Sequence, residues 1–187
     1  LKSLQGRTLH HFITRHLYPF SPYYRKLFDK NKIDPQRIRT VDDLKSIPFS
    51  SKNSFLDASN EDPAKGTLAF CLQPSEDTLK RYLTKTDLIK FLCLNALKGK
   101  EYVKDRLERE YKPIFLTATA GTTNKPISFL YTNYDIDNLY ISGKRILGII
   151  GIKKERAAVN VFPYAPHLAF WQTVFSGIAA DVFILST

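Results

Sequence analysis

The feature that most constrains this chain is a run of small, hydroxyl-bearing residues between two apolar segments. Residues 113–116 (PIFL) and 127–131 (ISFLY) have the composition of strands, and residues 117–126 between them read TATAGTTNKP. Small residues let backbone N–H groups close around an anion, threonine hydroxyls donate further hydrogen bonds, and a lysine adds a positive charge. The pattern therefore predicts a strand, a phosphate-binding loop and a second strand over residues 113–132.

This loop differs from a Walker A motif. Lys125 stands between Asn124 and Pro126, whereas the Walker lysine is followed by Ser or Thr at the start of a helix. Proline also disfavours helical backbone at the residue before it. The sequence therefore excludes a P-loop, and we expect residues 119–125 to be a solvent-accessible, mobile connection between two strands.

The loop resembles the phosphate-binding loop of the adenylate-forming (acyl-CoA synthetase) superfamily, whose pattern is roughly Ser/Thr-Ser-Gly-Thr-Thr-Gly-Lys-Pro. Six positions match that pattern: Thr119, Gly121, Thr122, Thr123, Lys125 and Pro126. Two positions depart from it, because Ala120 lacks a hydroxyl and Asn124 replaces a glycine. Asparagine tolerates positive φ better than most residues, so the turn can be kept.

The N-terminal part of the chain resembles the opening of phenylacetate–CoA ligase-like enzymes. The similar segments, in order, are residues 21–28 (SPYYRKLF), 33–35 (IDP), 41–44 (VDDL) and 47–52 (IPFSSK). The two resemblances together cover the first sixty residues and the region from about residue 113. Residues 57–112 are longer and more helical than this family leads us to expect. A relative with a different substrate or acceptor therefore stays open beside an aryl–CoA ligase.

The order of the predicted elements indicates an α/β fold. Helical signals dominate the first part: apolar spacing over residues 9–17, a Ser21-Pro22 helix start, and a Thr40–Asp43 capping box. A loop over residues 57–66 and helices broken near Gly99 follow, at residues 75–97 and 99–110. Strands and helices then alternate: a helix after Asn133, a strand over 157–162, a helix over 167–177 and a strand over 181–186.

Such alternation implies a mixed, largely parallel sheet. We therefore predict that residues 1–187 form a single truncated N-terminal domain of an adenylate-forming enzyme. Residues 1–60 would be its helical N-terminal segment, and residues 113–187 its α/β part with the phosphate loop.

A second candidate site lies in residues 162–171 (FPYAPHLAFW), which follow a predicted strand and begin a helix. His167 can hydrogen-bond a carboxylate, and Tyr164, Phe170 and Trp171 can wall an apolar pocket. The alternative is a core cluster of aromatic side chains with a satisfied histidine. Both candidate loops follow the carboxyl ends of predicted strands, so we expect His167 to share one cavity with the phosphate loop.

The resemblance implies an enzyme that joins a carboxylate to ATP, releases pyrophosphate and passes the acyl group to a thiol, usually CoA. It assigns the β- and γ-phosphates to a set of loop residues, with Mg²⁺ bridging phosphate oxygens. It also places His167 and Tyr164 near the carboxylate and allows a homodimer. The loop set is Thr119, Thr122, Thr123 and Lys125, with Gly121 allowing close backbone approach. The family's later Tyr-Gly-x-Thr-Glu segment, ribose-binding aspartate and C-terminal lysine are not in these residues, so we expect the chain alone to be inactive.

Two other functions stay open from the sequence. One is a related adenylating enzyme with a non-CoA acceptor, of the deazaflavin-coenzyme adenylating synthetase or acyl-protein synthetase type. The other is a basic, non-enzymatic module that binds nucleic acid, because 28 Lys and Arg against 18 Asp and Glu give a net charge of +10. Charges of both signs interleave over residues 98–110, which favours a solvated helix face first, a field for anionic ligands second and nucleic acid third.

Several features point to a cytoplasmic protein without a metal centre. Cys71 and Cys93 lie in apolar surroundings that suit buried, reduced thiols. The most apolar run, residues 168–185, is interrupted by polar residues and is not expected to span a membrane. His10 and His11 are adjacent on a predicted helix and are expected at the surface, and no zinc-ligand spacing occurs.

Overall fold

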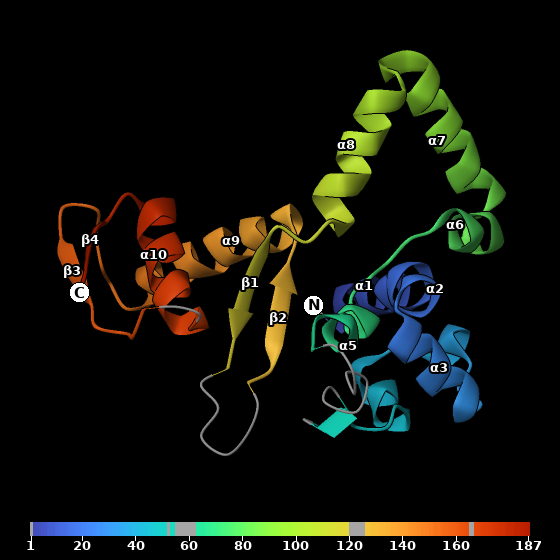
Figure 1. Ribbon diagram of the computed structural model, residues 1–187, viewed down its shortest axis with the longest axis horizontal. Coiled ribbons are helices and arrows are strands. Elements are labelled where there is room, and N and C mark those ends of the chain that lie inside the picture. The colour runs from blue at the N-terminus through green and yellow to red at the C-terminus, as the bar shows by residue number, and fades with distance from the viewer. Residues whose placement is uncertain (1, 52, 55–62, 120–125, 165–166) are drawn as a thin grey trace. The chain divides into compact units, whose positions relative to one another are not determined.

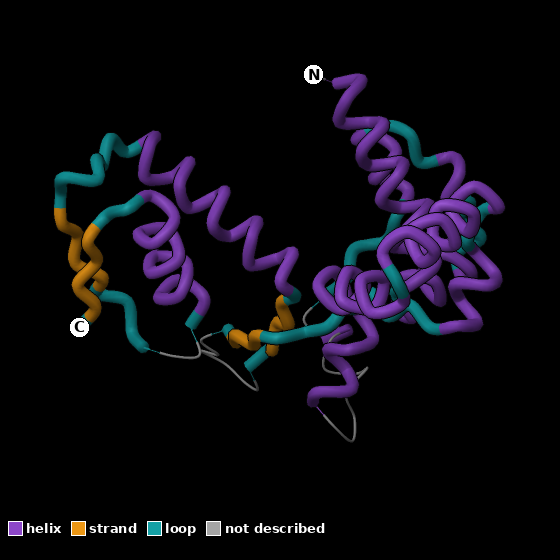
Figure 2. The backbone as a smooth tube through the Cα atoms, turned by 90° about the horizontal axis from the view of Figure 1, so that it is seen from above, coloured by secondary structure: helices purple, strands orange, loops and turns teal. Residues whose placement is uncertain are grey.

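A computed structural model describes residues 2–51, 53–54, 63–119, 126–164 and 167–187. The chain divides into two compact units, Leu1–Arg106 and Leu107–Thr187 (Figure 1). The described part of the first unit is helical, and the second unit combines helices with strands (Figure 2).

The described residues of the first unit begin with four consecutive helical segments and continue through two short 3₁₀ turns to four further helices. The first group is α1 (Lys2–Phe12), the π-helical turn η1 (Ile13–Leu17), α2 (Tyr18–Phe20) and α3 (Pro22–Lys30). The 3₁₀ turns are η2 (Pro35–Arg37) and η3 (Val41–Ser46). The later helices are α5 (Pro63–Phe70), α6 (Glu76–Tyr82), α7 (Lys85–Lys98) and α8 (Lys100–Tyr111), the last crossing the boundary between the units.

Local sequence signals explain where the early helices begin. Ser21 is the N-cap of α3 and accepts a hydrogen bond from the Tyr24 amide, with Pro22 in the first turn. The Asp43 carboxylate accepts the Thr40 N–H at 2.8 Å and the Thr40 hydroxyl at 2.9 Å. Both predicted helix starts are therefore confirmed. The core of this unit is made by Ile13, Phe28 and Ile38.

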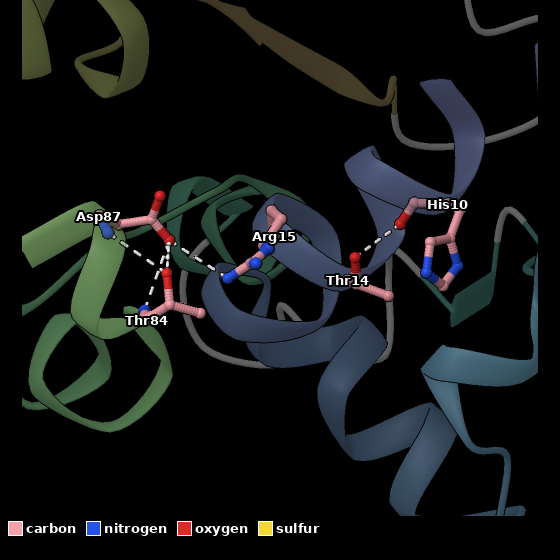
Figure 3. A network of polar contacts seen from close by, with 5 residues as sticks. All are labelled: His10, Thr14, Arg15, Thr84 and Asp87. Carbon is pink, nitrogen blue, oxygen red and sulfur yellow. Dashed lines mark hydrogen bonds and ion pairs between the residues drawn. The ribbon is translucent and has the colours of Figure 1, made fainter. Parts of the chain in front are cut away.

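A network of polar contacts ties the start of α7 to η1 (Figure 3). Arg15 donates to the Asp87 carboxylate at 3.2 Å, and Asp87 also accepts the hydroxyl of Thr84, the N-cap of α7. The Thr84 hydroxyl lowers the pKa of Asp87 because it stabilises the ionised carboxylate. The neighbouring His10 is partly buried, and its Nδ1 lies 2.8 Å from the Ile38 carbonyl. The sequence did not reveal this contact of His10, because Ile38 lies 28 residues further along the chain.

After the end of α8, the described part of the second unit contains two pairs of strands and two helices. Strands β1 (Phe115–Ala118) and β2 (Ser128–Tyr131) pair antiparallel, with Phe115 opposite Tyr131 and Ala118 opposite Ser128. Helix α9 (Asn133–Ile149) follows, then β3 (Ala157–Asn160), α10 (Leu168–Ala180) and β4 (Phe183–Ser186). Strands β3 and β4 pair parallel, with Ala157 opposite Phe183. The predicted α/β fold is confirmed, and the described strands form one antiparallel and one parallel pair.

Helices α9 and α10 approach closely at a glycine. A Cβ placed on Gly143 would lie 2.7 Å from the Cα of Ser176, so only glycine fits there without a shift of backbone. Gln172 of α10 donates to the Leu139 carbonyl of α9 at 3.1 Å and to the Ser176 hydroxyl at 3.3 Å. These contacts hold α10 against α9.

Four local expectations need correction. Residues 63–66 belong to α5 rather than to a loop, and the helix predicted over 75–97 is divided at Leu83–Thr84 by a new capping box. The N-cap of α9 is Thr132, not Asn133, because the Thr132 hydroxyl accepts the Asp135 amide. Cys93 is exposed rather than buried.

The charged side chains of α8 form ion pairs both near the end of their own helix and with another helix. Lys112 and Glu108 form the expected i,i+4 pair at 2.8 Å, but Arg109 pairs at 2.6 Å with Asp137 of α9. Over the residues that the structure describes, no helix has the length and apolar character needed to cross a membrane. Within the same residues, no three His, Cys, Asp or Glu side chains gather in a way that could hold a metal ion.

Candidate functional site

The candidate site is built around the end of the β1–β2 pair where the chain leaves β1 and later enters β2. Thr117 and Ala118 at the end of β1 are buried, whereas Thr119 is exposed. The Thr119 amide donates to the Ile127 carbonyl at 2.9 Å, and the Ile127 amide donates to the Thr119 Oγ1 at 3.1 Å. This reciprocal pair closes the base of the loop between the strands. The two predicted strands are confirmed, and residues 120–125 between them lie outside the described residues.

Thr119 has a structural role that the sequence did not reveal. Its hydroxyl oxygen accepts a backbone N–H, so one lone pair serves to hold the loop closed. The hydroxyl proton is still available to donate to an anion. Gly121, Thr122, Thr123 and Lys125 lie outside the described residues, so their phosphate-binding roles, like the mobility of this loop, stay predictions.

His167 lies beside this loop base. Its backbone forms an isolated parallel β-bridge with Ala118, the residue before Thr119. It is the residue that precedes α10, and its side chain makes no capping hydrogen bond to that helix. Among the described residues, its Nδ1 is buried and finds no hydrogen-bond partner. Buried polar nitrogens in proteins normally have a partner, so this atom is a candidate contact for a ligand.

The three aromatic side chains near His167 have different surroundings. Phe170 is buried, and Trp171 lies with its ring centroid 5.3 Å from Phe115 of β1 and 6.0 Å from Phe175 of α10. Tyr164 is 69% exposed, and its ring centroid lies 5.3 Å from that of Phe170 and 6.1 Å from that of Trp171. Phe170 and Trp171 thus form a packed aromatic cluster between β1 and α10, with Tyr164 at its exposed edge. The substrate-pocket role of Tyr164 and Trp171 stays a prediction.

Sequence reasoning missed Asn160, a fully buried amide at the end of β3. Its Nδ2 donates to the Phe170 carbonyl at 3.2 Å and to the Ser186 hydroxyl at 3.3 Å, and its Oδ1 accepts the Phe162 amide at 3.2 Å. A polar residue at the last position of an apolar strand, directly before the aromatic loop, was the signal that could have identified it.

Comparison with solved structures identifies the class of fold. No protein-family model and no curated protein sequence matches this chain. The fold of the chain is similar to that of part of a solved CoA ligase.

The similar structures are of 2-hydroxyisobutyryl-CoA ligase in three complexes. The chain aligns over 100% of its length with the complex with 2-HIB-AMP in the postadenylation state (TM-score 0.70, 12% identity). It aligns over 98% with the complex with 2-HIB-AMP and CoA in the thioesterification state (TM-score 0.65, 13% identity). A third complex, with R3-HIB-AMP, gives a TM-score of 0.55 at 13% identity. In each case the chain spans 31% of the ligase's length.

Proposed function

We propose that this chain is part of an ATP-dependent acid–thiol ligase of the phenylacetate–CoA ligase-like type. One observation carries the proposal: the Ala118–His167 bridge joins the two candidate segments at the base of the hydroxyl-rich loop. It does so in a chain whose whole length follows the fold of a ligase bound to an acyl adenylate. Fold alone does not determine function, so the proposal depends on this site and on the residues around it.

The proposed chemistry has two steps. A carboxylate oxygen attacks the α-phosphorus of ATP, and pyrophosphate leaves, which gives an acyl adenylate. A thiolate, which we take to be that of CoA, then attacks the acyl carbon, and AMP leaves with the electron pair of the broken C–O bond. A carboxylate is a poor electrophile, and AMP is a good leaving group. This is why the reaction requires residues that hold a triphosphate.

Each predicted residue has a definite task in this scheme. Thr122, Thr123 and Lys125 would hold the β- and γ-phosphates, with Gly121 allowing the backbone to approach and Mg²⁺ neutralising the phosphate charge. Thr119 would keep the loop closed and donate its hydroxyl proton to the same phosphates. His167 would donate a hydrogen bond to the substrate carboxylate and orient it, with Tyr164 and Trp171 beside the acyl group.

The direct test is carboxylate-dependent exchange of labelled pyrophosphate into ATP, measured on the complete polypeptide that carries these residues. A panel of short aliphatic, 2-hydroxy and arylacetic acids covers the acyl groups that an aromatic-edged site would accept. We expect exchange with at least one acid, and thioester formation when CoA is added. No exchange with any acid, from a folded protein that binds ATP, would contradict the proposal.

His167→Ala tests the role of the histidine. Loss of a hydrogen bond to a charged group costs about 1.5–3 kcal/mol, so kcat/KM for the acid should fall roughly ten- to a hundredfold. His11→Ala is the matched control, because His11 is exposed and belongs to the other unit. Equal, small losses in both variants would remove His167 from the site.

A further inference from the structure

Both ends of the Asn160 side-chain amide, the oxygen and the nitrogen, form hydrogen bonds. It is 1% exposed and ends β3. The Phe162 N–H can only donate and the Phe170 carbonyl can only accept, so these two contacts fix which end of the amide is oxygen and which is nitrogen. The second N–H of the amide is directed to the Ser186 hydroxyl. A buried amide with all of its partners in place rigidifies the elements that it joins.

These contacts hold both ends of one segment. The Phe162 contact forms a turn between the asparagine side chain and the backbone two residues later, which sets the direction of the chain as it leaves β3. The Phe170 contact ties the same side chain to the first turn of α10, directly after His167. The segment between them carries Tyr164 and His167. Asn160 therefore determines how far the start of α10 lies from the end of β3.

We propose that Asn160 is a positioning residue for His167 in the site described above. The effect of Asn160 on catalysis rests on the proposed function. Asn160 acts through its contacts to Phe162 and Phe170, which hold the start of α10 at the end of β3, so that the His167 backbone stays paired with Ala118 and its Nδ1 stays buried. Leucine has a similar volume, but it would leave the Phe162 N–H without this acceptor and the Phe170 carbonyl without this donor. Aspartate would place a carboxylate against the Phe170 carbonyl.

The first test measures the position of His167 without using activity. Diethylpyrocarbonate modification, mapped by mass spectrometry on the complete polypeptide, reports the accessibility of each imidazole, with exposed His11 as an internal reference. We expect the His167/His11 rate ratio to rise at least about fivefold in Asn160→Ala. Asn160→Ser keeps an acceptor near the Phe162 amide but cannot reach Phe170, so its ratio should fall between wild type and Asn160→Ala. An unchanged ratio in both variants would overturn the proposal.

The second test separates positioning from general destabilisation. Gln172→Ala is the matched control: Gln172 also joins elements of this unit through a side-chain amide, but it donates to Leu139 of α9 and to Ser176 within α10 rather than to the segment. We expect Asn160→Ala to reduce kcat/KM for the acid in pyrophosphate exchange about thirtyfold, with KM for ATP changed less than about threefold. Gln172→Ala should change both by less than about threefold.

The outcomes distinguish this inference from the proposed function. If the wild-type polypeptide shows no exchange, the proposed function fails, and the modification experiment still decides whether Asn160 positions His167. If the wild type is active and Asn160→Ala matches it, the inference fails while the proposed function stands. Equal losses in Asn160→Ala and Gln172→Ala would assign Asn160 a purely structural role and would also overturn the inference.

Discussion

Two glycines of α9 provide the sharpest test of the helix packing, because one substitution should have opposite effects at the two positions. Gly143 faces α10, where an added Cβ would lie 2.7 Å from the Ser176 Cα and 2.9 Å from its Cβ. Gly148 of the same helix has no atom within 4 Å of the corresponding position, and it is exposed. Carbon atoms pack favourably at about 3.5–4.0 Å. Gly143→Ala therefore forces the two helix backbones apart, and no change of rotamer can relieve a contact with a Cα.

The expected magnitudes follow from this geometry. Alanine is favoured over glycine by up to about 1 kcal/mol in a helix, so Gly148→Ala should raise the free energy of unfolding by as much as this. At Gly143 the same gain is opposed by an overpacking cost of roughly 1–3 kcal/mol. Gly143→Ala should therefore be about 1–3 kcal/mol less stable than Gly148→Ala.

Urea unfolding followed by fluorescence measures this difference well, because Trp171 is the single tryptophan and lies on α10. The slope of the transition should be unchanged in both variants, so that the shift in midpoint reports stability. Equal stability of Gly143→Ala and Gly148→Ala would show that α9 and α10 do not approach at Gly143. The described packing of the second unit would then be refuted.

Three further predictions concern the loop, the chain as a whole and the start of α7. In the complete polypeptide, Lys125→Ala should weaken ATP binding about ten- to a hundredfold and AMP binding much less, because AMP lacks the β- and γ-phosphates. Lys104→Ala is the control for net charge. Equal losses of affinity for ATP and AMP in both variants, measured by calorimetric titration, would show that Lys125 does not hold the phosphates. The 187-residue chain alone, which spans 31% of the ligase it resembles, should show no pyrophosphate exchange above that of a boiled sample. Asp87→Ala should lower the free energy of unfolding by less than about 1 kcal/mol at pH 7, because the Arg15 pair is partly exposed. The pKa of Asp87 is lowered from 3.8 in the folded state. This stabilisation is therefore fully present well above 3.8 and is lost progressively as the pH falls below that value towards the folded-state pKa, so circular dichroism melts should show a larger difference at pH 7 than at pH 3.

The sequence by itself determined those features that depend on neighbours three or four residues apart. Ser21 and the Thr40–Asp43 pair start helices because their side-chain oxygens reach backbone N–H groups within one turn. The β1–β2 hairpin was predictable because two short apolar runs flank a segment that offers no large apolar side chain to bury. The break at Gly99 was also local, since its φ of 85° is easy for glycine alone.

The candidate site was only partly accessible to the same reasoning. The segments that carry Thr119 and His167 could be identified from residue type, because small hydroxyl-bearing residues suit an anion and aromatic residues beside a histidine suit an apolar pocket with one polar group. The closing role of the Thr119 hydroxyl and the complete burial of Asn160 could not, since each depends on a partner outside its own turn. The same holds for Cys93, whose apolar neighbours in sequence did not bury it.

Tertiary structure alone decided which distant segments meet. It placed His167 beside Ala118, joined Arg109 to Asp137, and set Gly143 against Ser176. In each case the residue types permit many partners, and the partner is selected by how helices and strands pack once their apolar faces are buried. Packing of this kind is a property of the whole unit, because an approach of a few ångströms between two backbones requires all the surrounding side chains to fit at the same time.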